Sequence, residues 1–93
     1  RSLKPVLVEY PRKGMWAIGF ITFTTLDQLA LSNTDTLPTD SISVFIPTTP
    51  NPTSGYIIMV SKDEVIELEM SVEDAIKMII SLGVVVPAIG GKE

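Results

Sequence analysis

The segment FIPTTPNPTSGY, residues 45–56, constrains the fold most strongly because it places three prolines between two apolar runs. Each proline fixes its own φ angle and drives the residue before it into an extended conformation. Every residue from Ile46 to Pro52 except Thr48 is therefore restricted. A loop of this kind loses little entropy on folding, so the segment predicts a stiff connection between two strands.

The same loop is a candidate binding edge, because a rigid scaffold presents side chains to a partner at low ordering cost. Its hydroxyls and the bare backbone of its glycine suit a partner loop, a peptide or an anion. The candidate partner-binding residues are Thr48, Thr49, Pro50, Asn51, Pro52, Thr53, Ser54 and Gly55. The alternative is that the polar side chains only close the turn with hydrogen bonds.

Composition limits the classes of function. A chain of 93 residues has room for one domain with one modest core. It contains no histidine and no cysteine, so it lacks the side chains of Ser-His-Asp and Cys-His nucleophiles, thiol redox centres and the usual zinc sites. The net charge is −4, although residues 1–24 hold four basic residues and one acidic residue. We expect no nucleic-acid partner, because phosphate contacts supply most of that affinity, and no cofactor.

The apolar pattern predicts an α+β fold with a five- to six-stranded, mostly antiparallel sheet or partial barrel. The strands are expected at residues 6–10, 15–24, 42–46, 56–60 and 65–70. Residues 15–24 are apolar on both faces, which predicts a central strand, and Gly19 within them predicts a bulge, a bend or a close backbone approach. In the last strand, Ile66 is expected on the opposite face from Glu67 and Glu69, which share a solvent side. Residues 25–41 are expected to form a mobile loop.

One C-terminal helix is predicted at about residues 71–82. Ser71 is suited to cap it, and the acidic residues that follow favour the positive end of the helix dipole. Gly83 is expected to end it. The predicted apolar face consists of Val72, Ala75, Ile76, Ile79 and Ile80. Residues 84–87 are then expected to form a short buried extended segment.

Carboxylates alone can bind calcium or magnesium or act as an acid and base pair, so the acidic residues are a candidate site. These are Asp63, Glu64, Glu67, Glu69, Glu73 and Asp74. Their spacing does not match a calcium-binding loop, and strand alternation and helix capping already explain them. We therefore expect neither a metal site nor a catalytic site.

Three blocks together resemble a known family: VEYPRKGMWAIGF at residues 8–20, VFIPTTPNPTSGY at 44–56 and VIELEMSVEDAIKMIISLGVVVP at 65–87. They are similar to the domain-of-unknown-function family DUF502, which includes the plant CONTINUOUS VASCULAR RING-like membrane proteins. The resemblance implies an integral membrane protein with hydrophobic helices ahead of this domain. Residues 1–93 are then expected to be a single soluble domain, consistent with a start at Arg1. No enzymatic activity is implied.

Arg12, Lys13 and Trp16 are membrane-proximal candidates if an anchor precedes Arg1. Basic side chains near a bilayer gain about 1 kcal/mol each against anionic lipid, and tryptophan favours the interface. The alternative is a solvated turn beside a core tryptophan.

The leading functional hypothesis is a non-enzymatic domain that mediates self-assembly or binds a protein partner, in a protein anchored in a membrane. The alternative is a small-molecule or ion-sensing regulatory domain coupled to membrane helices. A hydrolase is a third hypothesis, and it requires a nucleophile and a base within hydrogen-bond reach.

Overall fold

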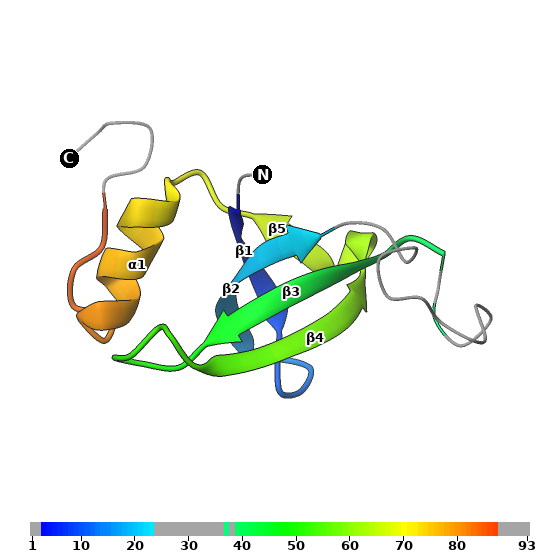
Figure 1. Cartoon of the computed structure of the whole chain (residues 1–93), viewed down its shortest axis with the longest axis horizontal. Coiled ribbons are helices and arrows are strands. Elements are labelled where there is room, and N and C mark those ends of the chain that lie inside the picture. Colours follow the sequence, from blue (N-terminus) through cyan, green and yellow to red (C-terminus); the bar gives the residue numbers. More distant parts are fainter. Residues whose placement is uncertain (1–2, 24–36, 38, 88–93) are drawn as a thin grey trace.

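A computed structural model describes residues 3–23, 37 and 39–87 (Figure 1). These residues form one sheet and one α-helix. The elements are β1 (Lys4–Glu9), β2 (Trp16–Phe23), β3 (Ser41–Pro47), β4 (Gly55–Ser61), the 3-10 helix η2 (Lys62–Glu64), β5 (Val65–Glu67) and α1 (Val72–Ile80). The predicted α+β fold with a five-stranded antiparallel sheet and one C-terminal helix is confirmed.

The strands lie in the order β4-β3-β2-β1-β5, and every neighbouring pair is antiparallel. The apolar strand β2 is the middle one, as its two apolar faces predicted. It joins β1 through the turn at residues 10–15, where the Tyr10 amide donates to the Met15 carbonyl at 2.9 Å.

The two edge strands of this sheet are neighbours in the sequence. Only η2 separates the end of β4 from the start of β5, although three other strands lie between them in the sheet. Ser61 caps η2 by accepting from the Asp63 amide, and Glu64 returns the contact by accepting from the Ser61 amide. A connection this short requires the sheet to curl until its edges approach each other, so the molecule is a partial barrel that does not close.

Among the described residues, the curl buries one face of the sheet without a helix against it. That face carries the larger core cluster, which consists of Val6, Val8, Ile42, Val44 and Ile46. The other face is covered by α1, where Phe20 packs with Ala75 and Ile79. The register explains the division, because Phe20 faces Phe45 on one side of the sheet while Ile21 faces Val44 on the other.

Gly19 lies where two central strands approach closely. A Cβ atom there would lie 2.7 Å from Val44 Cγ1 and 2.9 Å from the carbonyl oxygen of Phe45. One of the three expectations for this glycine, a close approach to a neighbouring strand, is therefore confirmed. The register shift between β2 and β3 lies further along, between Ile21 and Phe23.

The helix begins as its sequence predicts. The Ser71 hydroxyl accepts from the Asp74 amide at 3.0 Å. At the other end, Leu82 and Gly83 adopt positive φ angles, and the Gly83 amide donates to the Met78 carbonyl at 2.8 Å. The predicted apolar face is wrong in one member, because Ile80 is 53% exposed and does not join the cluster that Ala75 and Ile79 form with Phe20.

The expectation that residues 84–87 are buried is wrong. Val84, Val85 and Val86 are 83%, 51% and 66% exposed. The amides of Val84 and Val85 bond to the Ser81 carbonyl and hydroxyl, so the chain closes the helix end and stays on the surface.

The prediction for the last strand is also corrected. It ends at Glu67 rather than residue 70, and Val65 packs on the larger core while Ile66 is exposed. The reason is that β5 is an edge strand, and the cluster beneath α1 does not extend to Ile66. Most of the expected mobile loop, residues 25–41, lies outside the described residues, but Ser41 is the buried first residue of β3.

The close approach at Gly19 predicts that Gly19→Ala destabilises the domain by about 1–3 kcal/mol, because the added methyl group forces β2 away from β3. Urea unfolding followed by circular dichroism measures the change. Val84→Ala, at an exposed position, is the control and should change stability by less than about 0.5 kcal/mol. Equal unfolding midpoints for the two variants would contradict the close approach.

Candidate interaction surface

The proline-rich loop between β3 and β4 is held together by its own polar groups. The Thr48 amide donates to the Ser54 carbonyl at 2.8 Å. The Thr48 hydroxyl donates to the Asn51 carbonyl at 2.6 Å and lies 2.7 Å from the Ser54 hydroxyl. Asn51 Oδ1 accepts from both the amide and the hydroxyl of Thr53, at 3.1 and 2.6 Å. The loop is therefore a preformed unit.

These hydrogen bonds occupy most of the polar side chains among the predicted partner-binding residues. Thr48, Asn51, Thr53 and Ser54 use their polar side chains inside the loop, which matches the alternative that they close the turn. Gly55 has a structural role as well, because a Cβ atom there would clash with the carbonyl oxygen of Ile46. The loop thus presents a partner with a fixed shape rather than with many unbonded hydrogen-bond donors. Partner binding by residues 48–55 stays a prediction.

The strand that follows the loop forms a free apolar edge. β4 pairs with β3 on one side and with no other strand among the described residues. Tyr56 and Ile57 are 61% and 67% exposed. No charged residue occurs between Ser41 and Ser61. Sequence reasoning concentrated on the loop and missed this edge, although the absence of charge is visible in the sequence.

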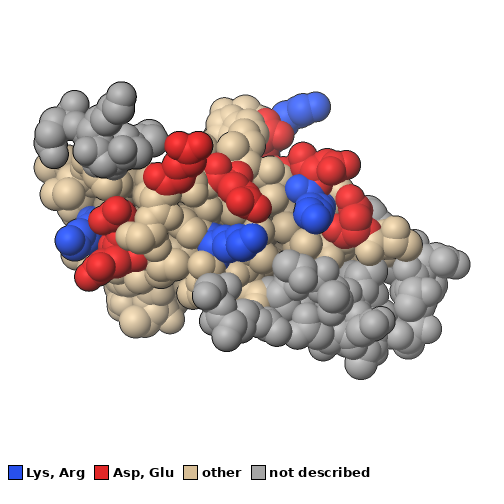
Figure 2. Space-filling model, turned by 90° about the horizontal axis from the view of Figure 1, so that it is seen from above, with Lys and Arg blue, Asp and Glu red and all other residues tan. Residues whose placement is uncertain are grey.

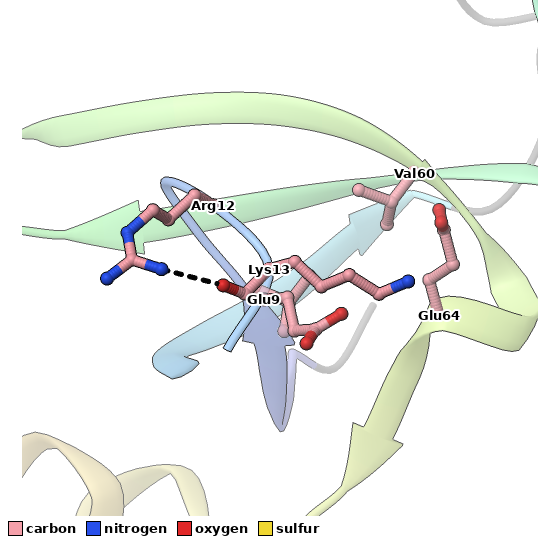
Figure 3. A pocket seen from close by; sticks show the side chains of 6 residues that line it. Glu9, Arg12, Lys13, Val60 and Glu64 are labelled. Carbon is pink, nitrogen blue, oxygen red and sulfur yellow. Dashed lines mark hydrogen bonds between the residues drawn. The ribbon is translucent and has the colours of Figure 1, made fainter. Parts of the chain in front are cut away.

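A small cleft lies beside β4, where the curled sheet stays open (Figure 3). Its volume is about 330 Å³, and it is lined by Val8, Glu9, Arg12, Lys13, Val60 and Glu64. The rings of Tyr10 and Tyr56 lie 6.0 Å apart, centroid to centroid, and connect the end of β1 to the start of β4. We call this opening between β4 and the β1–β2 turn the seam.

The charged groups of the seam are largely occupied by local contacts. Glu9 Oε2 accepts from the Gly14 amide at 2.9 Å, and Glu64 Oε1 accepts from the Ser61 amide at 3.1 Å. The Arg12 guanidinium donates to the Lys13 carbonyl at 3.1 Å. Figure 3 shows the Lys13 side chain extending across the cleft toward Glu64. The cleft therefore presents both signs of charge around an apolar floor.

The membrane-proximal candidates lie together on and beside the β1–β2 turn. Arg12 and Lys13 are exposed, and Trp16 is 49% exposed, so the alternative of a core tryptophan does not describe it. This turn lies at the opposite end of β1 from Lys4, and a six-residue strand is about 20 Å long. Proximity to a membrane therefore does not follow from closeness to Arg1 and stays a prediction. On the face seen in Figure 2, positive and negative side chains are interspersed rather than separated.

The acidic residues are spread over several local roles. Glu64 completes the cap of η2, and Glu67 lies 3.9 Å from Lys4 Nζ in an exposed ion pair. Within residues 3–23, 37 and 39–87, no group of three or more His, Cys, Asp or Glu side chains is arranged to hold a metal ion.

Comparisons with known proteins place the chain in a family. The sequence profile of the family described as "Protein of unknown function (DUF502)" matches residues 1–54. The chain belongs to the DUF502 family. It is 31% identical over 83 residues to "Protein LIKE COV 2" of Arabidopsis thaliana, a match that covers 89% of this chain and 30% of the relative. No solved structure matches the chain.

Family membership is consistent with the expectation that this domain comes from a membrane-associated protein. The chain spans less than a third of the length of its Arabidopsis relative. In the part of the chain that the structure describes, no helix has the length and apolar character needed to cross a bilayer.

The internal bonding of the loop predicts that Asn51→Ala loosens it without unfolding the domain. Loss of the acceptor for the Thr53 amide should cost about 1 kcal/mol locally and speed exchange of that amide about fivefold, measured by NMR. Thr49→Val is the matched control, because the Thr49 side chain takes no part in the hydrogen bonds that hold the loop together. Unchanged Thr53 exchange in Asn51→Ala would show that the prolines alone hold the loop.

Proposed function

We propose that this domain is a non-enzymatic association domain of a membrane-associated protein and that it self-assembles through the hairpin formed by β3, the stiff loop and β4. The observation that carries the proposal is the free edge of β4, which is seven residues long, uncharged and exposed at Tyr56 and Ile57. Natural sheets protect such edges with lysine, proline, bulges or short length, because an open edge pairs with other chains. β4 has none of these protections along its length.

The distribution of charge supports a protein partner over a lipid surface. Segments that bind anionic membranes carry lysine or arginine beside their apolar face. The hairpin from Ser41 to Ser61 has neither. The cores of protein interfaces, in contrast, are depleted in charge and enriched in tyrosine and other large side chains.

A second exposed apolar segment supports the same conclusion. Leu82 is 65% exposed and precedes the exposed valines 84–86. Figure 1 shows that the end of α1 and the β3–β4 loop lie at the same end of the long axis of the molecule. Large apolar side chains exposed together in this way are typical of interaction sites.

The absence of histidine and cysteine from the chain supports a non-enzymatic role, because most nucleophilic and acid–base machinery uses them. Function then depends on surfaces, and the edge of β4 is the most distinctive surface that the described residues offer.

A second candidate function is the sensing of a small charged ligand, and the seam is the observation that favours it. The cleft lies at the lower end of the size range of small-molecule sites and carries cations and carboxylates around Val8 and Val60. A thermal-shift screen of amino acids, dicarboxylates and divalent cations tests it. A shift lost in Lys13→Gln but kept in Lys77→Gln would support sensing, and no shift with any of these compounds would remove it.

The proposed function predicts that the domain forms a defined oligomer at micromolar or higher concentration. Size-exclusion chromatography with light scattering over a range of concentrations measures it. Ile57→Lys should weaken association at least about tenfold, because pairing the edge then buries an unpaired ammonium group.

Ile66→Lys is the matched control, because Ile66 is also an exposed isoleucine on an edge strand but lies on β5. It should leave association unchanged. A protein that is monomeric at every concentration tested would overturn the proposal. If both variants weaken association equally, the interface does not lie at β4.

A further inference from the structure

We infer that two copies of this chain pair β4 to β4, antiparallel, about a two-fold axis that passes midway between the Ile58 residues of the two copies. The inference rests on the proposed self-assembly and names its partner and register. It follows from the length of β4, the alternation of its side chains and the distribution of charge along it.

Symmetry fixes the register. In a continuous antiparallel sheet, directly opposed residues point to the same face, so a strand paired with its own copy must place one residue directly opposite the same residue of the second copy. For the seven residues of β4 to be paired along their whole length, that residue is the central one, Ile58. Ile57 then faces Met59 of the second copy, and Tyr56 faces Val60.

The resulting pairs are complementary on both faces of the sheet. On the face that carries α1, Ile57 and Met59 are opposed twice, once on each side of the axis. On the face of the larger core, Tyr56 and Val60 are opposed in the same way. No charged side chain lies anywhere along the pair, so the symmetry brings no like charges together, which in opposed positions destabilises a sheet.

The other edge of the sheet does not offer an equivalent partner. β5 has three residues and includes Glu67, which carries an ion pair with Lys4. Pairing of β4 with β5 of another copy would leave much of β4 uncovered, and head-to-tail contacts of that kind also build open filaments. Pairing of β4 with β4, in contrast, gives a closed dimer, because each copy uses its β4 edge once.

The register also gives the stiff loop a place in the interface. In an antiparallel pair, residues that precede β4 in one copy lie beside residues that follow β4 in the other. Ser54 therefore lies beside Lys62 of the second copy, and the loop at residues 48–54 lies along η2. Glu64 of η2 lines the cleft of the seam, so the uncharged polar loop of one copy lies next to the cleft of the other. A loop that is already ordered loses little entropy there.

Single-cysteine variants test the register directly, because the chain has no cysteine of its own. Directly opposed residues have Cα atoms about 4.5–5.5 Å apart, within the range that a disulfide spans. Under mild oxidation, Ile58→Cys should give mostly covalent dimer on non-reducing gels. Tyr56→Cys, which faces Val60 instead of its own copy, and Ile66→Cys on β5 should give at least about fivefold less.

A second test does not depend on disulfide formation. Ile57→Lys and Met59→Glu should each impair self-association, but an equimolar mixture should form dimers, because the introduced lysine faces the introduced glutamate across the axis. Ile57→Lys mixed with Ile66→Glu is the control: Ile66→Glu should dimerise with itself, and the Ile57→Lys protein should not be rescued into dimers as it is by Met59→Glu. Circular dichroism confirms that each variant is folded.

The outcomes separate the inference from the proposed function. A monomeric wild-type protein overturns both. A second outcome is a wild-type oligomer that Ile57→Lys weakens, with the strongest cross-linking at Tyr56→Cys or Ile66→Cys and no dimers in the mixture. This result would support self-assembly but overturn the two-fold pairing of β4 with β4. Strong cross-linking of Ile58→Cys together with rescue in the mixture establishes the register.

Discussion

The structure depends on one short connection. Three residues, Lys62–Glu64, join the two edge strands of a five-stranded sheet, and the reciprocal cap between Ser61 and Glu64 holds them in place. The sheet must curl to satisfy this link, and the curl buries Val6 and Val44 in the larger core cluster. The described residues contain one α-helix, which covers the other face, so the curl makes a second core possible.

The same connection leaves the seam open. Among the described residues, each of the two edge strands pairs with a neighbour on one side only, and the two edges differ. β5 is short and carries an ion pair, whereas β4 is longer, apolar and uncharged. The domain therefore has one protected edge and one edge suited to pairing. The proposed assembly follows from this difference rather than from any catalytic group.

The candidate site was only partly predictable from the sequence. The prolines showed that the loop at residues 48–54 is stiff, because they act on the backbone locally. They did not show that the polar side chains of Thr48 and Asn51 form hydrogen bonds within the loop. The unbroken apolar run identified Tyr56 to Val60 as a strand, but whether that strand is central or at an edge depends on contacts with residues far away in the sequence.

Local features follow from the amino-acid sequence alone: the stiff turn from proline geometry, the start of α1 from the Ser71 cap, and the central position of β2 from its two apolar faces. Which apolar residues are exposed, in contrast, depends on the tertiary structure. Val84–Val86 have the composition of a buried strand but lie on the surface, and Ile66 faces outward while Val65 faces inward. The physical reason is that burial depends on strand order and on the curl of the sheet, which arise from pairings between distant residues and leave no periodic signal within either segment.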